Sequence, residues 1–258
     1  MLVQPGLAGD WHMAADSVIA AHVGEGKVPS TVRLYNWFPE TISLGYHQNE
    51  DEIDLEACRR DEVKVVRRPT GGRAIYHSDE ITYAAIFPRT SRMYNSQLLA
   101  CYANVSRVIK AALEQFPIRI DDFEAAGSSG AYGRSPICFS EALSYELTID
   151  GKKIVGSAQR RWPDRVLQHG SILLGNSHQK LADYLHLPPE QKAIEKSKLL
   201  NSTASVKDVY PLSISLPQFA EALQESFFRL FKIDLIPGEL TSEELQKIER
   251  AREKFRVV

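Results

Sequence analysis

A short cationic segment, Arg67 to Arg73, surrounds a pair of glycines. Arg67, Arg68 and Arg73 carry permanent charges that suit a phosphate or carboxylate ligand. Gly71 and Gly72 have no Cβ, so a ligand can approach the backbone closely there. The segment matches neither the P-loop nor the dinucleotide-binding fingerprint. Two interpretations therefore remain open: a ligand-binding loop, or a strand-ending turn whose arginines pair with nearby acidic residues.

A cysteine, Cys138, follows a stretch of loop composition and precedes a hairpin pattern. A loop thiol can act as a nucleophile when a nearby cation lowers its pKa. Lys152 and Lys153 follow the next strand, and one of them can supply that cation or hold an acyl carbonyl. Strand alternation places them on opposite faces, so at most one points toward a site. A buried structural cysteine is the commoner case, and Cys58 and Cys101 are interpreted that way.

The seven histidines do not pair with cysteines or carboxylates at zinc-site spacing, so no metal site is predicted. His77 follows the glycine segment, and His169 lies in a Gln-His-Gly-Ser run. For both, packing or hydrogen bonding is favoured over catalysis. The chain also lacks a nucleophile-elbow motif and the basic–aromatic array typical of nucleic-acid binding.

Composition excludes several classes of protein. The chain has 258 residues and a formal net charge of -2, which argues against coating nucleic acid or an anionic membrane. No apolar run reaches the roughly 18 residues needed to cross a bilayer. The first ten residues lack a signal-peptide pattern, and three cysteines do not make a disulfide framework. We expect a cytoplasmic protein with neither nucleic-acid nor membrane partners.

The first half of the chain reads as strands broken by turns, followed by a helix. Short apolar or alternating runs predict strands within residues 32–46, 63–66 and 81–87. From residue 95 to 116 apolar residues recur every three or four positions, which predicts a long amphipathic helix ended by Pro117. Residues 127–135 have the composition of a loop.

The second half contains the clearest hairpin signal, Asp150-Gly151 between alternating runs. This dipeptide suits a type I′ turn, because both positions need positive φ. Residues 166–174 predict another strand. Capping boxes at Ser215 and Thr241 open two helices, and we interpret the second, mostly charged, as a solvated terminal helix. With no linker between two cores, residues 1–258 are expected to form one α/β (α+β) domain with a mixed β-sheet and flanking helices.

Three segments, in order, resemble signatures of the lipoate–protein ligase and octanoyltransferase superfamily. The first is RRPTGGR at residues 67–73, followed by His77 and by EITY at residues 80–83. The second is GKKIVGSAQ at residues 151–159, whose signature lysine corresponds to Lys153, and the third is LQHGSIL at residues 167–173. The resemblance runs from about residue 10 to about 250. It implies the class II biotin/lipoyl ligase-like catalytic fold.

Within that superfamily, Cys138-Phe139 before the run SYEL at residues 144–147 resembles the cysteine-dependent octanoyl-[acyl carrier protein]:protein N-octanoyltransferases. This resemblance implies that Cys138 and Lys153 are catalytic. The implied reaction moves an octanoyl or lipoyl group from acyl carrier protein to a lysine of a lipoyl domain, through a thioester on Cys138 and without a cofactor. Glycine-cleavage H protein and the E2 subunit of 2-oxoacid dehydrogenases are the implied acceptors. The implied substrate-binding residues are Arg67, Arg68, Gly71, Gly72, Arg73, His77, Tyr83, Gly156, Ser157, Ala158, Gln159, His169 and Gly170.

Three other functions remain open. An ATP- and Mg²⁺-dependent lipoate–protein ligase subunit would use Arg68, Gly71, Gly72 and Lys153 to hold lipoyl-adenylate, with Cys138 incidental. An amidotransferase would move the acyl group from one lipoyl domain to another. A non-catalytic module would only bind a lipoyl domain or carrier. The chain is expected to be too short to hold an accessory C-terminal ligase domain beside the catalytic one, which favours the transferase.

Overall fold

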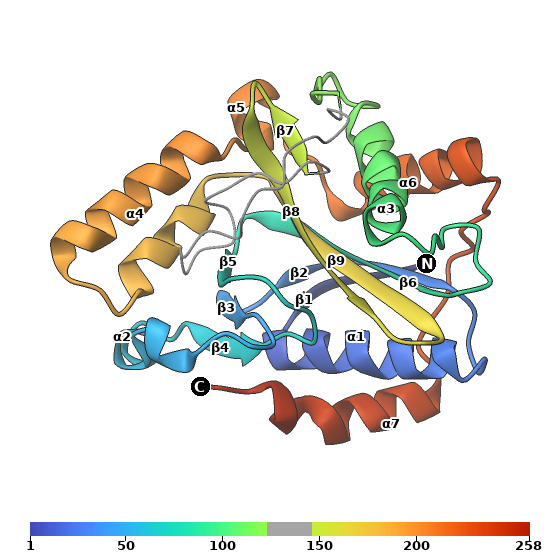
Figure 1. Ribbon diagram of the computed structural model, residues 1–258, viewed down its shortest axis with the longest axis horizontal. Coiled ribbons are helices and arrows are strands. Elements are labelled where there is room, and N and C mark those ends of the chain that lie inside the picture. The colour runs from blue at the N-terminus through green and yellow to red at the C-terminus, as the bar shows by residue number, and fades with distance from the viewer. Residues whose placement is uncertain (123–145) are drawn as a thin grey trace.

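The computed structural model describes residues 1–122 and 146–258 and is built around a six-stranded sheet (Figure 1). The first pair of strands is parallel and the other neighbours are antiparallel, so the sheet is mixed. In spatial order the strands are β1 (Leu2–Leu7), β2 (Thr31–Trp37), β6 (Glu80–Pro88), β9 (Arg165–Leu173), β8 (Lys152–Arg161) and β7 (Leu147–Ile149). The strands predicted at 81–87 and 166–174 are thereby confirmed.

A separate three-stranded sheet stands where the sequence predicts a single sheet. Its strands, in spatial order, are β4 (Lys64–Arg67), β3 (Thr41–Leu44) and β5 (Ile75–His77). β3 runs parallel to β4 and antiparallel to β5. The prediction of one sheet was wrong because strand patterns locate strands but not partners: β3 follows β2 in the chain yet pairs with later segments.

One face of the large sheet is covered by α3 (Leu98–Leu113) and α6 (Leu216–Phe231). Apolar side chains of both helices join those of β2, β6 and β9 in the largest core cluster. The predicted helix at 95–116 is confirmed with slightly shorter bounds, and the predicted capping box at Ser215 is present. Cys101 is fully buried in this core, in keeping with the structural role predicted for it.

The opposite face of the large sheet is covered by α1 (Gly9–Gly24), and we refer to it as the α1 face. α7 (Ser242–Ala251) packs on the outer side of α1, so α1 lies between the sheet and α7 (Figure 1). Covered on two sides, α1 is buried nearly all round, and its buried residues include Asp10, His12, Asp16 and His22, so it has no apolar stripe that periodicity could reveal. The interpretation of α7 as a solvated helix was wrong in part, because Ile248 is fully buried against α1.

The remaining helices flank the small sheet or complete the last third of the chain. They are η1 (Glu50–Glu52), α2 (Leu55–Arg60), η3 (Ser177–Tyr184), α4 (Pro189–Ser202), α5 (Val206–Val209) and η4 (Arg252–Phe255). Cys58 of α2 is fully buried, and burial raises the pKa of its thiol to about 11. Within residues 1–122 and 146–258, no helix has the length and apolar character needed to span a membrane.

The predicted hairpin is confirmed, and it contains a β-bulge that the sequence did not reveal. Asp150 and Gly151 have φ of 50° and 73°, as a type I′ turn requires. Leu147 then pairs with Val155, whereas Thr148 pairs with Lys153, so β8 has one extra residue between these pairs. A bulge of this kind changes which face the following side chains occupy.

Candidate functional site

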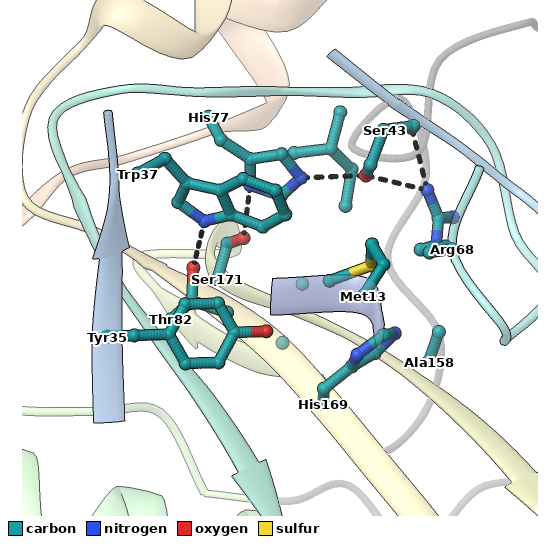
Figure 2. Close-up of a pocket in the computed structure, with 13 residues that line it drawn as sticks. Met13, Tyr35, Trp37, Ser43, Arg68, His77, Thr82, Ala158, His169 and Ser171 are labelled. Atoms are coloured by element: carbon teal, nitrogen blue, oxygen red, sulfur yellow. Dashed lines mark hydrogen bonds between the residues drawn. The ribbon is translucent and has the colours of Figure 1, made fainter. Parts of the chain in front are cut away.

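A pocket lies on the α1 face, between the two sheets and α1 (Figure 2). The large sheet contributes backbone at Gly156 and Gly170. The small sheet contributes Ile75, and Met13 reaches in from α1. The other lining residues, from the two sheets and the segment after β4, are Tyr35, Trp37, Ser43, Arg68, His77, Thr82, Ala158, His169 and Ser171. The pocket therefore brings together segments from five distant parts of the chain.

One wall of the pocket carries a hydroxyl–imidazole–carboxylate relay. The Ser43 Oγ lies 2.7 Å from His77 Nε2, and His77 Nδ1 lies 2.8 Å from Glu80 Oε1. All three side chains are buried. In the tautomer whose Nδ1–H donates to this carboxylate, Nε2 accepts the Ser43 hydroxyl. Trp37 stacks on this imidazole with ring centroids 3.9 Å apart and an interplanar angle of 11°.

Glu80 is the centre of this wall. Its Oε1 also accepts the hydroxyls of Thr82 and Ser171, at 2.5 and 2.8 Å. Burial works to raise the pKa of Glu80, but His77 and the hydroxyl donors outweigh it and hold that pKa below its ordinary value. The Trp37 indole donates to Thr82 Oγ1 at 2.7 Å. The donors of the wall thus converge on Glu80 Oε1, while Glu80 Oε2 is buried without a hydrogen-bond partner.

A second relay of the same type flanks the other side of the pocket. Thr70 Oγ1 lies 2.6 Å from His169 Nε2, and His169 Nδ1 lies 2.9 Å from Asp16 Oδ2. Burial lowers the pKa of His169, and Asp16 opposes the shift without cancelling it. Burial would raise the pKa of Asp16, but the buried Arg33 guanidinium that it contacts and His169 hold it below its ordinary value. His169 is therefore neutral near pH 7, with Nδ1 protonated.

Arg68 fixes the glycine segment through hydrogen bonds to backbone carbonyls. This buried guanidinium donates to the carbonyls of Ser43, Gly71 and Arg73 at 2.7 to 3.1 Å. Gly72 has a φ of +92°, which L-residues rarely adopt. Among the described residues, a Cβ at Gly71 would meet no atom within 4 Å. Arg68 thus fixes a turn whose backbone is open to a ligand on its outer side.

The two outer arginines of that segment pair with acidic residues. Arg67 Nη2 lies 2.7 Å from Glu50 Oε1, and its Nη1 donates to the carbonyls of Gly45 and Gln48. Arg73 Nη1 lies 3.5 Å from Glu52 Oε1. The sequence left open a ligand-binding loop or a strand-ending turn whose arginines pair with acidic residues, and these contacts agree with the second. Substrate binding by Arg67 and Arg73 stays a prediction.

Lys153 is buried on the α1 face, as the bulge requires. Leu147 and Ile149 of β7 point into the core on the α3 side, so Thr148 between them points to the α1 face. Lys153 pairs with Thr148 across the hairpin, and its side chain therefore points to the α1 face as well. Gly156 and Ala158 share that face, because they pair with Ser171 and His169. The next residue toward the turn, Lys152, is exposed. The two lysines thus lie on opposite faces of β8, as strand alternation predicts, and a site role for Lys153 stays a prediction.

The Lys153 ammonium forms an ion pair with Glu146, with Nζ 2.5 Å from Oε1. The two side chains are 2% and 3% exposed, so the pair is shielded from water. Cys138 and the predicted loop at 127–135 lie outside the described residues, and their placement stays a prediction.

Three predicted site residues face the α3 side of the sheet instead of the pocket. The hydroxyls of Tyr83 and Ser157 lie 2.6 Å apart, and the Gln159 amide donates to Gln168 at 2.9 Å. Their neighbours Gly156, Ala158, His169 and Gly170 line the pocket. Successive residues of a strand point to opposite faces of the sheet. Some residues of a contiguous signature therefore face the pocket, and the others face the α3 side.

Sequence reasoning missed several residues of the site, above all Ser43, which lines the pocket, and Glu80 and Asp16, which bond to the pocket histidines His77 and His169. Ser43 and His77 are 34 residues apart, and His169 and Asp16 are 153 apart. A usable signal existed for Glu80 and Thr82, which alternate with Ile81 and Tyr83 in a strand already predicted. No three His, Cys, Asp or Glu side chains converge as metal ligands in the part of the chain that the structure describes.

Comparisons with known proteins agree with this geometry. Residues 9–228 match the model of the lipoyl protein ligase A/B catalytic domain. The octanoyltransferase LipM of Moorella thermoacetica is 34% identical over 252 residues, covering 95% of this chain and 90% of that protein. The octanoyltransferase LipM of Staphylococcus aureus is 32% identical over 255 residues, covering 95% and 91%.

Solved structures share the fold. A lipoate-protein ligase A bound with ATP superposes with a TM-score of 0.77 at 20% identity, covering 98% of this chain and 94% of that one. A bipartite lipoate protein ligase from Thermoplasma acidophilum, solved with its E2 lipoyl domain, gives 0.76 at 18% identity, covering 98% and 91%. The expected ligase-like fold, with mixed β-structure and flanking helices, is confirmed, and it has a second, smaller sheet beside the one expected.

Proposed function

This chain belongs to the lipoyl protein ligase A/B catalytic domain family, and we propose that it transfers an octanoyl group from acyl carrier protein to a lipoyl domain through a thioester on Cys138. It is an acyltransferase of protein lipoylation. The observation that carries this assignment is the identity of about a third, over 95% of the chain, with proteins named octanoyltransferase LipM. The same proposal includes the acceptors, which are lipoyl domains such as glycine-cleavage H protein or a 2-oxoacid dehydrogenase E2 subunit. It also treats residues 1–258 as a single catalytic domain.

The proposed reaction has two steps. In the first, the Cys138 thiolate attacks the octanoyl carbonyl, the bond to the carrier sulfur breaks, and the carrier thiolate leaves and takes up a proton. In the second, the acceptor lysine attacks the Cys138 thioester, an amide bond forms, the amine loses a proton and the Cys138 thiolate is regenerated. Exchange between thioesters is nearly isoenergetic and amide formation is downhill, so the proposal requires neither ATP nor a metal ion.

Lys153 is the cation that we assign to this chemistry. A fixed ammonium stabilises a thiolate, and the same charge stabilises the oxyanion that develops on an attacked carbonyl. Three observations support the assignment: Lys153 is 1% exposed, faces the same side of the sheet as the pocket, and is held by Glu146. Glu146 follows Cys138 by eight residues in the chain.

The pocket is the proposed acyl site. Its imidazole and hydroxyl donors bond to Glu80 Oε1 and Asp16, so an octanoyl tail strands none of these donors, while Glu80 Oε2 is buried without a hydrogen-bond partner. Gly156 contributes no side chain to the wall, which leaves room beside β8. Arg68 holds the Gly71–Gly72 turn that borders the pocket.

The direct test is transfer in a defined mixture. Octanoyl-acyl carrier protein, an unmodified lipoyl domain and this protein are incubated without nucleotide and with EDTA, and the mass of the lipoyl domain is recorded. The proposal predicts octanoylation of its lysine. Loading only with free lipoate, ATP and Mg²⁺ would make the chain a ligase. Loading only from an already octanoylated lipoyl domain would make it an amidotransferase, and no loading under any condition would leave a binding module.

A further inference from the structure

We propose that three arginines near the end of β8, Arg89, Arg160 and Arg161, form the docking surface for an acidic acyl carrier protein. We refer to them as the hairpin arginines, because they surround the turn that joins β8 to β9. The inference rests on the proposed function, since it takes acyl carrier protein as the acyl donor. It assigns to that donor a surface well away from Lys153.

The hairpin arginines lie at the end of β8 opposite to β7 (Figure 1). Arg160 and Arg161 are the last two residues of β8, and alternation places their side chains on opposite faces of the sheet. Arg89 follows β6, and its Nη1 donates to the carbonyl of Pro163 in the β8–β9 turn at 3.0 Å. Within the described residues, no strand pairs with the outer side of β8 beyond Val155. A protein that approaches this edge can therefore contact arginines on both faces.

Arg160 is held in one place on the α1 face. Its Nη1 donates to the carbonyl of Pro69 at 2.8 Å, which ties it to the segment before the glycine turn. Its guanidinium lies over the rings of Tyr46 and Trp162, with both centroids 4.7 Å away. Stacking uses the faces of a guanidinium and leaves N–H groups at its rim for a carboxylate.

Arg161 and Arg89 share a tyrosine on the other face. Their guanidinium groups lie over the ring of Tyr94, at 5.0 and 5.3 Å from its centroid. Arg161 also donates to the Tyr94 hydroxyl and to the carbonyl of Asn95, each at 2.9 Å. Two cations thus surround one ring, and neutral groups fix them there.

The charges of the hairpin arginines are not compensated. Among the described residues, none of the three forms an ion pair with a carboxylate, whereas Arg67 and Arg73 pair with Glu50 and Glu52. Carbonyl groups and aromatic rings fix a guanidinium without cancelling its charge. A rigid cationic surface attracts an acidic protein and orders few side chains on binding. Because the chain as a whole has a net charge of -2, attraction of an acidic partner depends on such a local surface.

The distance from Lys153 favours the donor over the acceptor as the protein that docks here. Arg160 follows Lys153 by seven residues on β8, which corresponds to roughly 20 Å at about 3.3 Å per residue. The acceptor lysine extends about 6 Å from its backbone, so a lipoyl domain seated on the hairpin arginines would not reach a carbonyl held at Lys153. A carrier protein presents its thioester on a phosphopantetheine arm of about 14 bonds, which spans roughly 17 Å. Of the two partners, the carrier matches the separation.

The experiment removes charges on the α3 side of the hairpin, away from the pocket. Arg89→Gln, Arg161→Gln and the double variant are compared with Arg60→Gln, which removes one charge from an exposed, acid-paired arginine of α2. Transfer is measured with octanoyl-acyl carrier protein and with octanoyl-pantetheine, which has the thioester but no carrier protein. Both reactions are followed at several salt concentrations, because salt screens exposed charges.

The hairpin variants are expected to weaken the use of the carrier only. Each single variant should raise KM for octanoyl-acyl carrier protein about 3-fold and the double variant about 10-fold, with kcat unchanged. The dependence of KM on salt should weaken in the same order. Arg60→Gln, and all reactions with octanoyl-pantetheine, should stay as in the wild type. Equal changes with both donors, or KM values like that of Arg60→Gln, would overturn the proposal.

Binding separates this inference from the proposed function. Calorimetry measures the affinity of Cys138→Ala for octanoyl-acyl carrier protein, with and without the two hairpin substitutions. Salt-sensitive binding that the substitutions weaken, while the wild type transfers no octanoate, would retain the surface and reject the transferase. Loss of affinity for a lipoyl domain instead of the carrier would assign the surface to the acceptor and overturn the proposal.

Discussion

Lys153 and Glu146 form an ion pair, 2.5 Å from Nζ to Oε1, in which both side chains are almost completely shielded from solvent. Lys153 reaches this position because the bulge in β8 turns it onto the α1 face. A buried pair of charges contributes little to stability compared with apolar residues of similar size, while the loss of one partner is costly. Under the proposed mechanism, the pair holds in place the cation that the reaction uses.

The first prediction separates the structural effect of this pair from its chemical effect. Lys153→Met is expected to reduce transfer by about 10²- to 10⁴-fold and to destabilise the fold by leaving Glu146 without its cation. The double variant Lys153→Met with Glu146→Leu is expected to regain stability and to remain inactive. Thermal unfolding and transfer rate are measured on the same samples, and wild-type transfer by the double variant would remove Lys153 from the mechanism.

The second prediction concerns Ser43, which has the partners of an activated serine, His77 and Glu80. Under the proposed mechanism its hydroxyl only satisfies the imidazole. Ser43→Ala is expected to keep the acyl-enzyme intermediate on Cys138 and to lose about 1–3 kcal/mol of stability, because the buried Nε2 loses its donor. Peptide mapping of the octanoylated protein locates the group, and octanoate on the Ser43 peptide would contradict the mechanism.

The third prediction uses two adjacent glycines as a matched pair. Gly72→Ala is expected to destabilise the protein by about 1–2 kcal/mol, since Gly72 has a φ of +92°. Gly71→Ala is expected to have little effect on stability, because its Cβ would point into open space. Chemical denaturation measures both. Equal losses in the two variants would show that the turn is not held as described.

The fourth prediction concerns the response of stability to pH. Burial, followed by repulsion from Arg33, lowers the pKa of His12 to about 3 from an ordinary 6.5. Between those values the unfolded chain binds a proton that the folded chain does not, so stability falls as the pH is lowered from 6.5 toward 3. The slope is about 1.4 kcal/mol per pH unit for this one group.

Replacement of His12 measures that contribution. His12→Gln should flatten the dependence of unfolding free energy on pH by about one proton between pH 4 and 6. The remaining slope comes from His169 and His178, whose pKa values burial lowers, and near pH 4 also from carboxylates such as Glu80, whose pKa lies below its ordinary value. An identical slope in wild type and variant would mean that His12 titrates normally in the folded protein.

Local sequence signals predicted the elements that depend on local chemistry. The positive φ values at Asp150 and Gly151, the α3 helix and the capping box at Ser215 follow from the residues at those positions. Pairing between strands could not be predicted in the same way, because β3 has no local feature that selects β4 and β5 over β2. That choice produced the second sheet, and with it the pocket.

Site residues that lie in contiguous sequence signatures could be predicted. Site residues that come together only because the fold joins distant segments could not. Resemblance located Lys153, Gly156, Ala158 and His169, but only the structure divides them from Ser157 on the opposite face. The bulge depends on the register of β7 against β8, which a one-residue insertion changes without a sequence signal.

The central claim is that Cys138 carries the acyl group, and intact-protein mass after incubation with octanoyl-acyl carrier protein tests it most directly. The incubation contains no ATP, and wild type is compared with Cys138→Ala. The account predicts an octanoyl adduct on the wild type alone, removed by hydroxylamine as a thioester is. An adduct of equal yield on Cys138→Ala, or ATP-dependent loading of a lipoyl domain by both proteins with no adduct on either, would contradict it.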